Sequence, residues 1–277
     1  MALGPVGLMF WAGREPAATL REVLDLGIET GQLGIPGDMA LDDAARQAWT
    51  AALDDTGFRL VTVFAAYKGE NYADIPTVQR TVGFIPRETR AERERRTVEV
   101  SDFAAALGVG AIACHIGFVP EDRESADRKA VLEMVRRLCD HAAKKGQTFA
   151  LETGQEPART LVDFIIDVNR PNLRVNFDPA NMILYGTGDP IDALDEAAPY
   201  VVSVHCKDGD WPPQGNRTSL GVERALGEGA VGVDRFISKL KAIGFEGPLN
   251  IEREIEDREQ RLIDIRRAAA LLNRLRV

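Results

Sequence analysis

The residues best suited to chemistry are three carboxylates and two histidines, each ending a short apolar run: His115, Glu152, Asp178, His205 and Glu252. Carboxylate oxygens combined with an imidazole nitrogen suit Mn²⁺, Mg²⁺, Co²⁺ or Zn²⁺. Three carboxylates in one place would repel one another unless a cation or shared protons compensated for their charge. Taken singly, each residue fits equally well as a strand-end side chain satisfied by hydrogen bonds. Together, Glu152, Asp178, His205 and Glu252 predict one divalent metal per chain, with Mn²⁺ as the first expectation.

The elements that must position these residues are short apolar runs that alternate with amphipathic helical stretches. This alternation is typical of βα units that feed a parallel sheet, and eight parallel strands close a barrel. We therefore predict a single (β/α)₈ TIM barrel, an α/β fold, spanning residues 1–277 as one domain. The eight expected strands are 5–11, 29–35, 59–66, 111–116, 148–153, 173–178, 200–206 and 248–253.

Alternation within the last five of these runs separates two faces, because successive side chains of a strand point in opposite directions. At alternate positions of each run the side chains are bulky and apolar, and these are expected to face the helices: Ile112, Cys114, Phe149, Leu151, Leu173, Val175, Phe177, Val202, Val204, Leu249 and Ile251. The positions between them carry small or polar side chains, and in each run the last of these is one of the five ionisable residues. These residues should therefore meet at the C-terminal mouth of the barrel, where barrel active sites are built.

Two long connections follow strands, so both belong to the same mouth: 66–90 and 207–232. The second contains Trp211 and the pair Pro212-Pro213, and its glycines, among them Gly209, Gly215, Gly221, Gly227 and Gly229, give its backbone freedom to rearrange. We predict that it folds over the substrate as an apolar cover with Trp211 in contact. An alternative interpretation is that Trp211 packs permanently against the rim or a partner subunit.

Composition excludes several classes of protein. The net charge of −9 has the wrong sign for a general nucleic-acid binder, and no apolar run approaches the roughly 18 residues that span a membrane. The apolar N-terminus lacks a basic leading region and is expected to be a strand, which favours a cytoplasmic protein. Cys114, Cys139 and Cys206 have no metal-site spacing and are expected to be reduced and buried.

Five short segments carry a further signal in their order and spacing: 151–156 (LETGQE), 175–181 (VNFDPAN), 203–208 (SVHCKD), 226–229 (LGEG) and 250–254 (NIERE). Together they resemble the sugar phosphate isomerase/epimerase superfamily, the xylose-isomerase-like barrels that include ketose 3-epimerases, hydroxypyruvate isomerase, inosose dehydratase and endonuclease IV. In the epimerase members the metal is held by a set of Glu, Asp, His and Glu residues. The resemblance maps this set onto Glu152, Asp178, His205 and Glu252, the same four residues that the strand alternation indicates. The resemblance also implies that Glu152 and Glu252 exchange a proton with the carbon next to a ketose carbonyl, through a metal-chelated enediolate.

The resemblance leaves the reaction open between epimerisation, aldose–ketose isomerisation and dehydration of an inosose-like keto-cyclitol. One departure is Asn181, which stands where ketose 3-epimerases have a substrate-contacting histidine. Asn181 can hydrogen-bond a hydroxyl but cannot titrate near neutral pH. An endonuclease activity would need more than the three histidines present, and a non-catalytic sugar-binding barrel would tolerate loss of one of the two glutamates.

Further substrate contacts are expected around the metal. His115 is either a substrate-binding residue or an orienter of a metal-ligating carboxylate, and Gln155 could touch substrate. Glu156 could do the same or pair with Arg159. Lys207 and Asp208 could bond a sugar hydroxyl or each other. The phosphorylation state of the small carbohydrate substrate stays open, because Lys207, Arg217 and Arg224 could bind phosphate or be solvated charges; a homo-oligomer also stays open.

Overall fold

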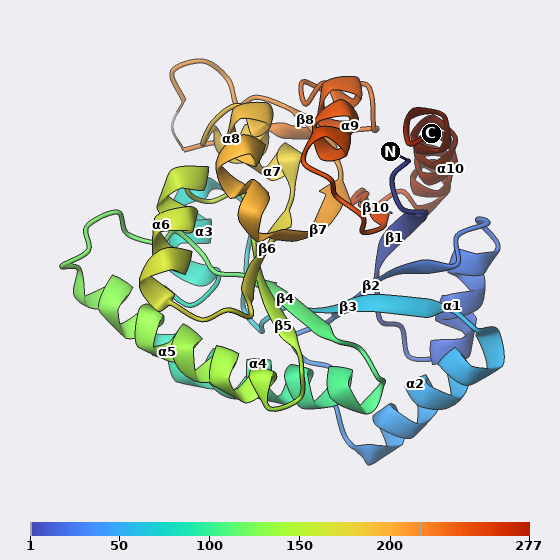
Figure 1. The fold of residues 1–277 in the computed structure, drawn as a ribbon, viewed down its shortest axis with the longest axis horizontal. Helices are drawn as coiled ribbons and strands as arrows, with labels where there is room; N and C mark the ends of the chain where they lie inside the picture. Colours follow the sequence, from blue (N-terminus) through green and yellow to red (C-terminus); the bar gives the residue numbers. More distant parts are fainter. Residues whose placement is uncertain (1, 217) are drawn as a thin grey trace.

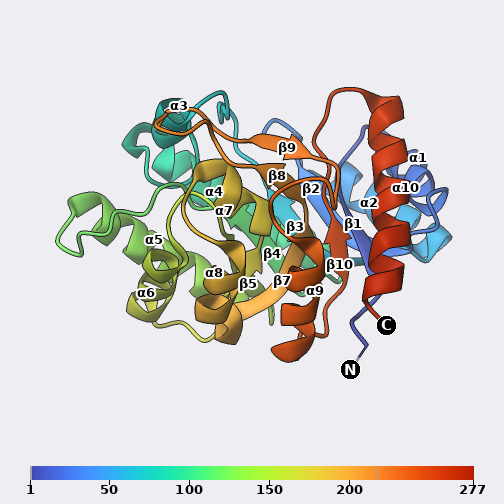
Figure 2. The same ribbon diagram turned by 90° about the horizontal axis from the view of Figure 1, so that it is seen from above.

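The structure, a computed structural model, describes residues 2–216 and 218–277. Within these residues eight parallel strands form a closed barrel in the spatial order β1-β10-β7-β6-β5-β4-β3-β2. Helices surround it, as Figures 1 and 2 show. This confirms the predicted single (β/α)₈ barrel. The barrel strands are β1 (Val6–Trp11), β2 (Thr30–Ile35), β3 (Arg59–Ala65), β4 (Ala111–His115), β5 (Thr148–Glu152), β6 (Leu173–Phe177), β7 (Val201–Cys206) and β10 (Leu249–Ile251).

Helices connect successive strands and cover the barrel from outside. Several begin at an aspartate whose carboxylate accepts a backbone N–H of the first turn, as Asp42, Asp74 and Asp257 do. The helices are α1 (Pro16–Leu24), α2 (Asp43–Thr56), α3 (Ile75–Thr81), α4 (Arg87–Ala106), α5 (Ala126–Ala143), α6 (Ala158–Val168), α7 (Pro179–Tyr185), α8 (Pro190–Ala197), α9 (Val233–Ala242) and α10 (Arg258–Leu275). None of these is both long and apolar enough to cross a membrane.

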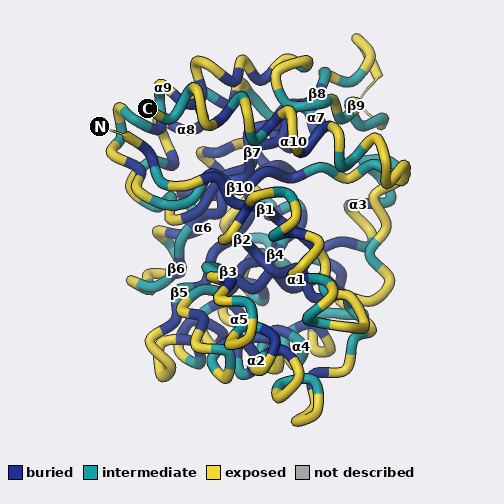
Figure 3. Tube along the Cα trace, turned by 90° about the vertical axis from the view of Figure 1, so that its right-hand side faces the viewer, coloured by how far each residue is buried: buried dark blue, intermediate teal, exposed yellow. Residues whose placement is uncertain are grey.

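The apolar core divides as the alternation predicts. A large cluster between strands and helices contains Ile112, Phe149, Leu151, Val175 and their outward-facing neighbours. A separate small cluster lies inside the barrel: Met9, Phe64, Ala113 and Ala150. Val202 departs from the prediction, since 38% of it is exposed near the start of β7. The buried strands run through the middle of Figure 3, beneath helices with exposed outer turns.

The long connection after β7 carries its own antiparallel pair of strands, β8 (Asp208–Asp210) and β9 (Val222–Arg224). In Figure 2 this pair and α3 lie on one side of the molecule, and both chain ends lie on the other. The backbone N–H of Leu3 donates to the carbonyl of Arg276, which ties the two ends together. The three cysteines are free and buried, as expected.

Candidate metal centre

Four barrel strands bring the predicted ligand set to one point. Glu152 is the last residue of β5, Asp178 caps the N-terminus of α7 just after β6, His205 lies on β7, and Glu252 follows β10. One potential ligand atom from each residue lies within 4.8 Å of the others. Because these strands are neighbours in a closed barrel, their inward-facing ends converge on the axis.

The imidazole of His205 is at the centre of this group. Its Nδ1 lies 2.8 Å from a Glu152 oxygen, 3.1 Å from a Glu252 oxygen and 3.5 Å from an Asp178 oxygen. Despite these short distances, Nδ1 makes no well-directed hydrogen bond within the described residues, and neither does the buried Oδ2 of Asp178. Buried polar atoms left without partners are costly. Their convergence fits a bound cation, which would satisfy all four groups together.

A second layer of polar side chains fixes the orientation of His205. Its Nε2 lies 2.8 Å from the amide oxygen of Gln32 and 3.2 Å from the amide nitrogen of Asn176; the shorter contact, to an oxygen that can only accept, favours a proton on Nε2. The Gln32 amide is itself oriented, because its nitrogen donates to Asn176 at 3.0 Å and Ser203 donates to the same Asn176 oxygen. With Nε2 donating to Gln32, Nδ1 is the nitrogen that faces the carboxylates. Their charge favours a proton on Nδ1, and once that proton is displaced the Nδ1 lone pair is free to bind a metal.

Burial and neighbouring charges shift the pKa values of the predicted ligands in opposite directions. Burial raises the pKa of Glu152 above its ordinary value, and His115 and His205 offset this only in part. Burial also opposes ionisation of Glu252, but His205 and Lys207 outweigh it and hold the pKa of that carboxyl below its ordinary value. Burial disfavours a charged His205, yet the carboxylates of Glu252 and Glu152 raise its pKa well above the usual value. The group therefore attracts positive charge.

A cavity of about 220 Å³ opens above these ligands and receives three of the predicted substrate residues: His115, Asn181 and Lys207. Nε2 of His115 lies 3.2 Å from Glu152, and the amide of Asn181 donates to Glu152 at 3.3 Å. Gln155 is buried behind them, with its amide nitrogen 3.1 Å from Nδ1 of His115. These contacts leave both interpretations of His115 in place, since it faces the cavity and also touches a ligand.

Lys207 bridges two acids on the cavity wall. Its ammonium lies 3.1 Å from Glu252 and 2.6 Å from Glu254. Burial opposes the charge on Lys207, but these two carboxylates outweigh it and raise the pKa of the ammonium well above its ordinary value. The lysine is therefore held as a charged donor beside Glu252, one of the four predicted ligands.

Asp208 and Trp211 lie outside this cavity. The buried carboxylate of Asp208 accepts four backbone N–H groups, from Gly209, Gly227, Gly229 and Val231. It thereby ties the two ends of the long connection together. Trp211 is 44% exposed and does not line the cavity. Arg224 pairs with Asp210 at 2.6 Å, and Arg217 lies outside the described residues.

Sequence reasoning missed several cavity residues. Trp11 and Phe64 occupy positions of their strands that point into the barrel. The same alternation, applied to the first three strands, would indicate both. Others come from the connections: Glu70, Tyr72, Tyr185 and Glu254. The ring of Phe64 packs against both histidines, with centroids 5.6 Å from His115 and 6.0 Å from His205.

Glu156 is a buried carboxyl that the metal centre does not use. It is 3% exposed, and neither of its oxygens has a well-directed hydrogen bond in the described part of the chain, although the nearby backbone of Val119 and of Glu156 itself favours the ionised form. Arg159, the partner considered from sequence, pairs instead with Asp163 at 3.0 Å. Burial raises the pKa of Glu156 to about 8, so the residue is a neutral acid at neutral pH.

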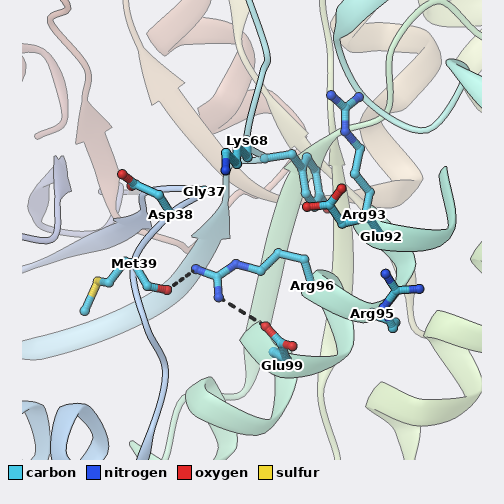
Figure 4. Close-up of a pocket in the computed structure, with 10 residues that line it drawn as sticks. Gly37, Asp38, Met39, Lys68, Glu92, Arg93, Arg95, Arg96 and Glu99 are labelled. Atoms are coloured by element: carbon cyan, nitrogen blue, oxygen red, sulfur yellow. Dashed lines mark hydrogen bonds and ion pairs between the residues drawn. The ribbon is translucent and has the colours of Figure 1, made fainter. Parts of the chain in front are cut away.

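A second hollow of about 310 Å³ lies beside α4 and is shown in Figure 4. Two of its three arginines are already engaged: Arg96 donates to the carbonyls of Pro36 and Met39, and Arg93 donates to those of Thr81 and Gly83. In the figure the two guanidinium groups point in different directions. We interpret Arg93 as a brace of the connection after β3, which supplies Glu70 and Tyr72 to the cavity, and Arg96 as a brace of the connection after β2.

Comparisons with known proteins agree with this architecture. The chain is similar to a xylose isomerase domain protein from Planctomyces limnophilus, with 46% identity, a TM-score of 0.94 and coverage of 99% of this chain and 98% of that one. It shares its fold with a xylose isomerase-like TIM barrel protein from Mycobacterium smegmatis in complex with magnesium, at 18% identity, a TM-score of 0.70 and coverage of 97% and 96%.

A D-psicose 3-epimerase crystallised in the presence of D-fructose also shares the fold, at 16% identity, with a TM-score of 0.72 and coverage of 98% and 99%. A comparison with curated proteins gave no match. Residues 20–275 match a family model described as a xylose isomerase-like TIM barrel, and the chain belongs to that family.

Proposed function

We propose that this chain is a divalent-metal-dependent isomerase or epimerase that removes a proton from the carbon next to the carbonyl of a keto sugar. The observation that carries the proposal is the convergence of Glu152, Asp178, His205 and Glu252, with unpartnered buried atoms on Asp178 and His205. A divalent cation held there would stabilise the negative charge that develops on the carbonyl oxygen. The magnesium complex of the mycobacterial relative supports the cation, and Mn²⁺ is our first choice.

The two glutamates supply the proton transfers. One carboxylate takes the proton, and the electron pair of the C–H bond becomes the new carbon–carbon double bond of an enediolate. The other, as the acid, returns a proton to the opposite face of the same carbon, which inverts it. Return to the neighbouring carbon instead gives aldose–ketose isomerisation. His115, Asn181 and Lys207 face the same cavity and are proposed to hold the sugar hydroxyls.

A dehydratase is the second candidate, because His115 gives the cavity an imidazole that could protonate a departing hydroxyl. The same enediolate would then lose a β-hydroxyl as water. Product mass separates the two reactions, since only the dehydratase forms a product lighter by one water molecule.

The test is turnover of a panel of ketoses, ketose phosphates and inososes by Mn²⁺-loaded protein in D₂O, followed by NMR. We expect solvent deuterium on a carbon next to the carbonyl and about one metal per chain by elemental analysis. Glu252→Gln should lower turnover by about 100-fold or more, whereas Glu246→Gln, an exposed glutamate before β10, should not. Product without deuterium after many turnovers would remove the two-glutamate mechanism.

A further inference from the structure

We propose that the substrate continues past Trp11 into an adjoining groove, so that the reacting sugar carries a second, uncharged ring or aglycone: the substrate is a glycoside. This inference rests on the proposed function, because it places the reacting ring in the cavity above the metal ligands. The groove has a volume of about 250 Å³ and lies between β1 and the connection from β10 to α10.

The cavity and the groove adjoin each other. Met9, Trp11, Glu252 and Glu254 line both of them, so these side chains are what separates the two hollows, and a ligand that extends over them reaches both. Each hollow alone is smaller than the roughly 300–1,000 Å³ of a pocket for a drug-sized ligand. Each therefore suits one ring, and the two together suit a molecule of two rings.

Trp11 forms the partition between them and is held in place. Its indole lies directly over Gly34 of the neighbouring strand, where an added Cβ would come within 2.6 Å of the ring. The absence of a side chain at Gly34 is what lets the ring lie flat on the barrel rim. Trp11 is nonetheless 44% exposed. A large, rigid aromatic with one open face beside a polar site is suited to stacking on the apolar face of a sugar or phenyl ring.

The charges of the two hollows favour an uncharged ligand. Lys207 is paired with Glu252 and Glu254, and Arg253 is paired with Glu223 at 2.7 Å and Asp264 at 2.8 Å. Both cations are therefore neutralised before any ligand arrives.

The third cation of the described lining, Arg261, donates to the carbonyl of Ile255. Glu254 and Glu256 line the same groove, and their carboxylates would repel a phosphate or a carboxylate. They can accept hydrogen bonds from hydroxyl groups. A neutral polyol or aryl group is the chemistry that fits.

The proposal can be tested by binding, without turnover. The probes are matched pairs of methyl and phenyl β-D-hexosides (glucoside, galactoside and mannoside), with affinities measured by NMR titration on Mn²⁺-loaded protein. At least one phenyl glycoside should bind about three- to tenfold more tightly than its methyl partner, which is the contribution of one aromatic stacking contact. Trp11→Ala should reduce this ratio to near one.

Two further variants allow the same test if Trp11→Ala folds poorly. Ile255→Ala, which alters only the groove, should reduce the phenyl preference, and Ile263→Ala, an exposed isoleucine on α10, should leave it unchanged. Equal binding of every pair, or a preference that survives both groove variants, would overturn the proposal. If glucose 6-phosphate bound more tightly than glucose, the inference that the ligand is uncharged would be wrong. If phenyl glycosides bound more tightly but turnover in D₂O incorporated no deuterium, the proposed reaction would be wrong, whereas the groove would still be a binding site for a second ring.

Discussion

Glu156 offers the sharpest quantitative test of the structure, because it is buried and neither of its oxygens has a well-directed hydrogen bond in the described part of the chain. Burial raises its pKa from the ordinary 4.5 to about 8. Below pH 4.5 the carboxyl is protonated in both the folded and the unfolded chain. As the pH rises from 4.5 to 8, the unfolded chain loses the proton and the folded chain keeps it, so the free energy of unfolding falls across this window.

The size of the effect follows from the same two values. Their difference of about 3.5, at about 1.4 kcal/mol per pH unit, corresponds to about 5 kcal/mol lost by pH 8. Glu156→Gln removes the titration. The cost of burying the new amide is the same at every pH, so the change in stability caused by the substitution should become more favourable by several kcal/mol between pH 5 and pH 8.

Urea denaturation of the wild type and Glu156→Gln at pH 5 and pH 8 measures this difference, and the contributions of all other groups cancel in the comparison. Glu246→Gln, at an exposed site, is the matched control and should show no pH-dependent difference. If Glu156→Gln changed stability equally at both pH values, Glu156 would not be held neutral in the folded protein. The argument from its burial would then be wrong.

Three further outcomes are expected. Gln32→Ala should weaken metal binding by about 10- to 100-fold in a metal titration, because it releases the proton-bearing nitrogen of His205; unchanged affinity would show that the tautomer is fixed by other groups. Metal binding should weaken as the pH falls and should release protons in calorimetry across buffers, because the carboxylates raise the pKa of His205 and the metal must displace its proton. Asp208→Ala should lower the free energy of unfolding by about 2–4 kcal/mol and speed hydrogen exchange of the Gly227 and Gly229 amides at unchanged metal content; slow exchange would refute its role as an anchor.

Strand positions were predictable because the physical rule behind them is local. Apolar runs of the right length alternate with amphipathic stretches, and the predicted ranges agree with the observed strands to within one or two residues at most ends, such as 148–153 against Thr148–Glu152. The parity rule then placed Glu152, Asp178, His205 and Glu252 at one mouth without knowledge of any contact. Helix starts are less predictable: Thr160 and Asp163 have the spacing of a capping box, which would favour a start at Thr160, whereas α6 begins at Ala158 behind Pro157.

The connections could not be predicted because their conformations depend on contacts between distant segments. The residue types in 207–232 suggested that Asp208 and Trp211 would face the substrate. The backbone folds instead around the Asp208 carboxylate, which satisfies amides up to 23 residues away in the sequence. Glu70 and Tyr72 reach the cavity only because arginines of α4 fix the connection that carries them. No local pattern encodes either arrangement.

The support of the metal ligands also depends on a contact across the barrel. Gln32 on β2 has no chemical signature in its own segment, yet it reaches Asn176 on β6 and His205 on β7. Elsewhere in the interior, Met9, Phe64, Ala113 and Ala150 form an apolar cluster, and its Phe64 ring packs against His205. The closed barrel lets Gln32, Asn176 and His205 bond to one another across the axis, while apolar side chains fill the remaining space. The polar side chains orient the predicted ligands, and Met9 of the apolar cluster lines both the cavity above them and the groove beside Trp11.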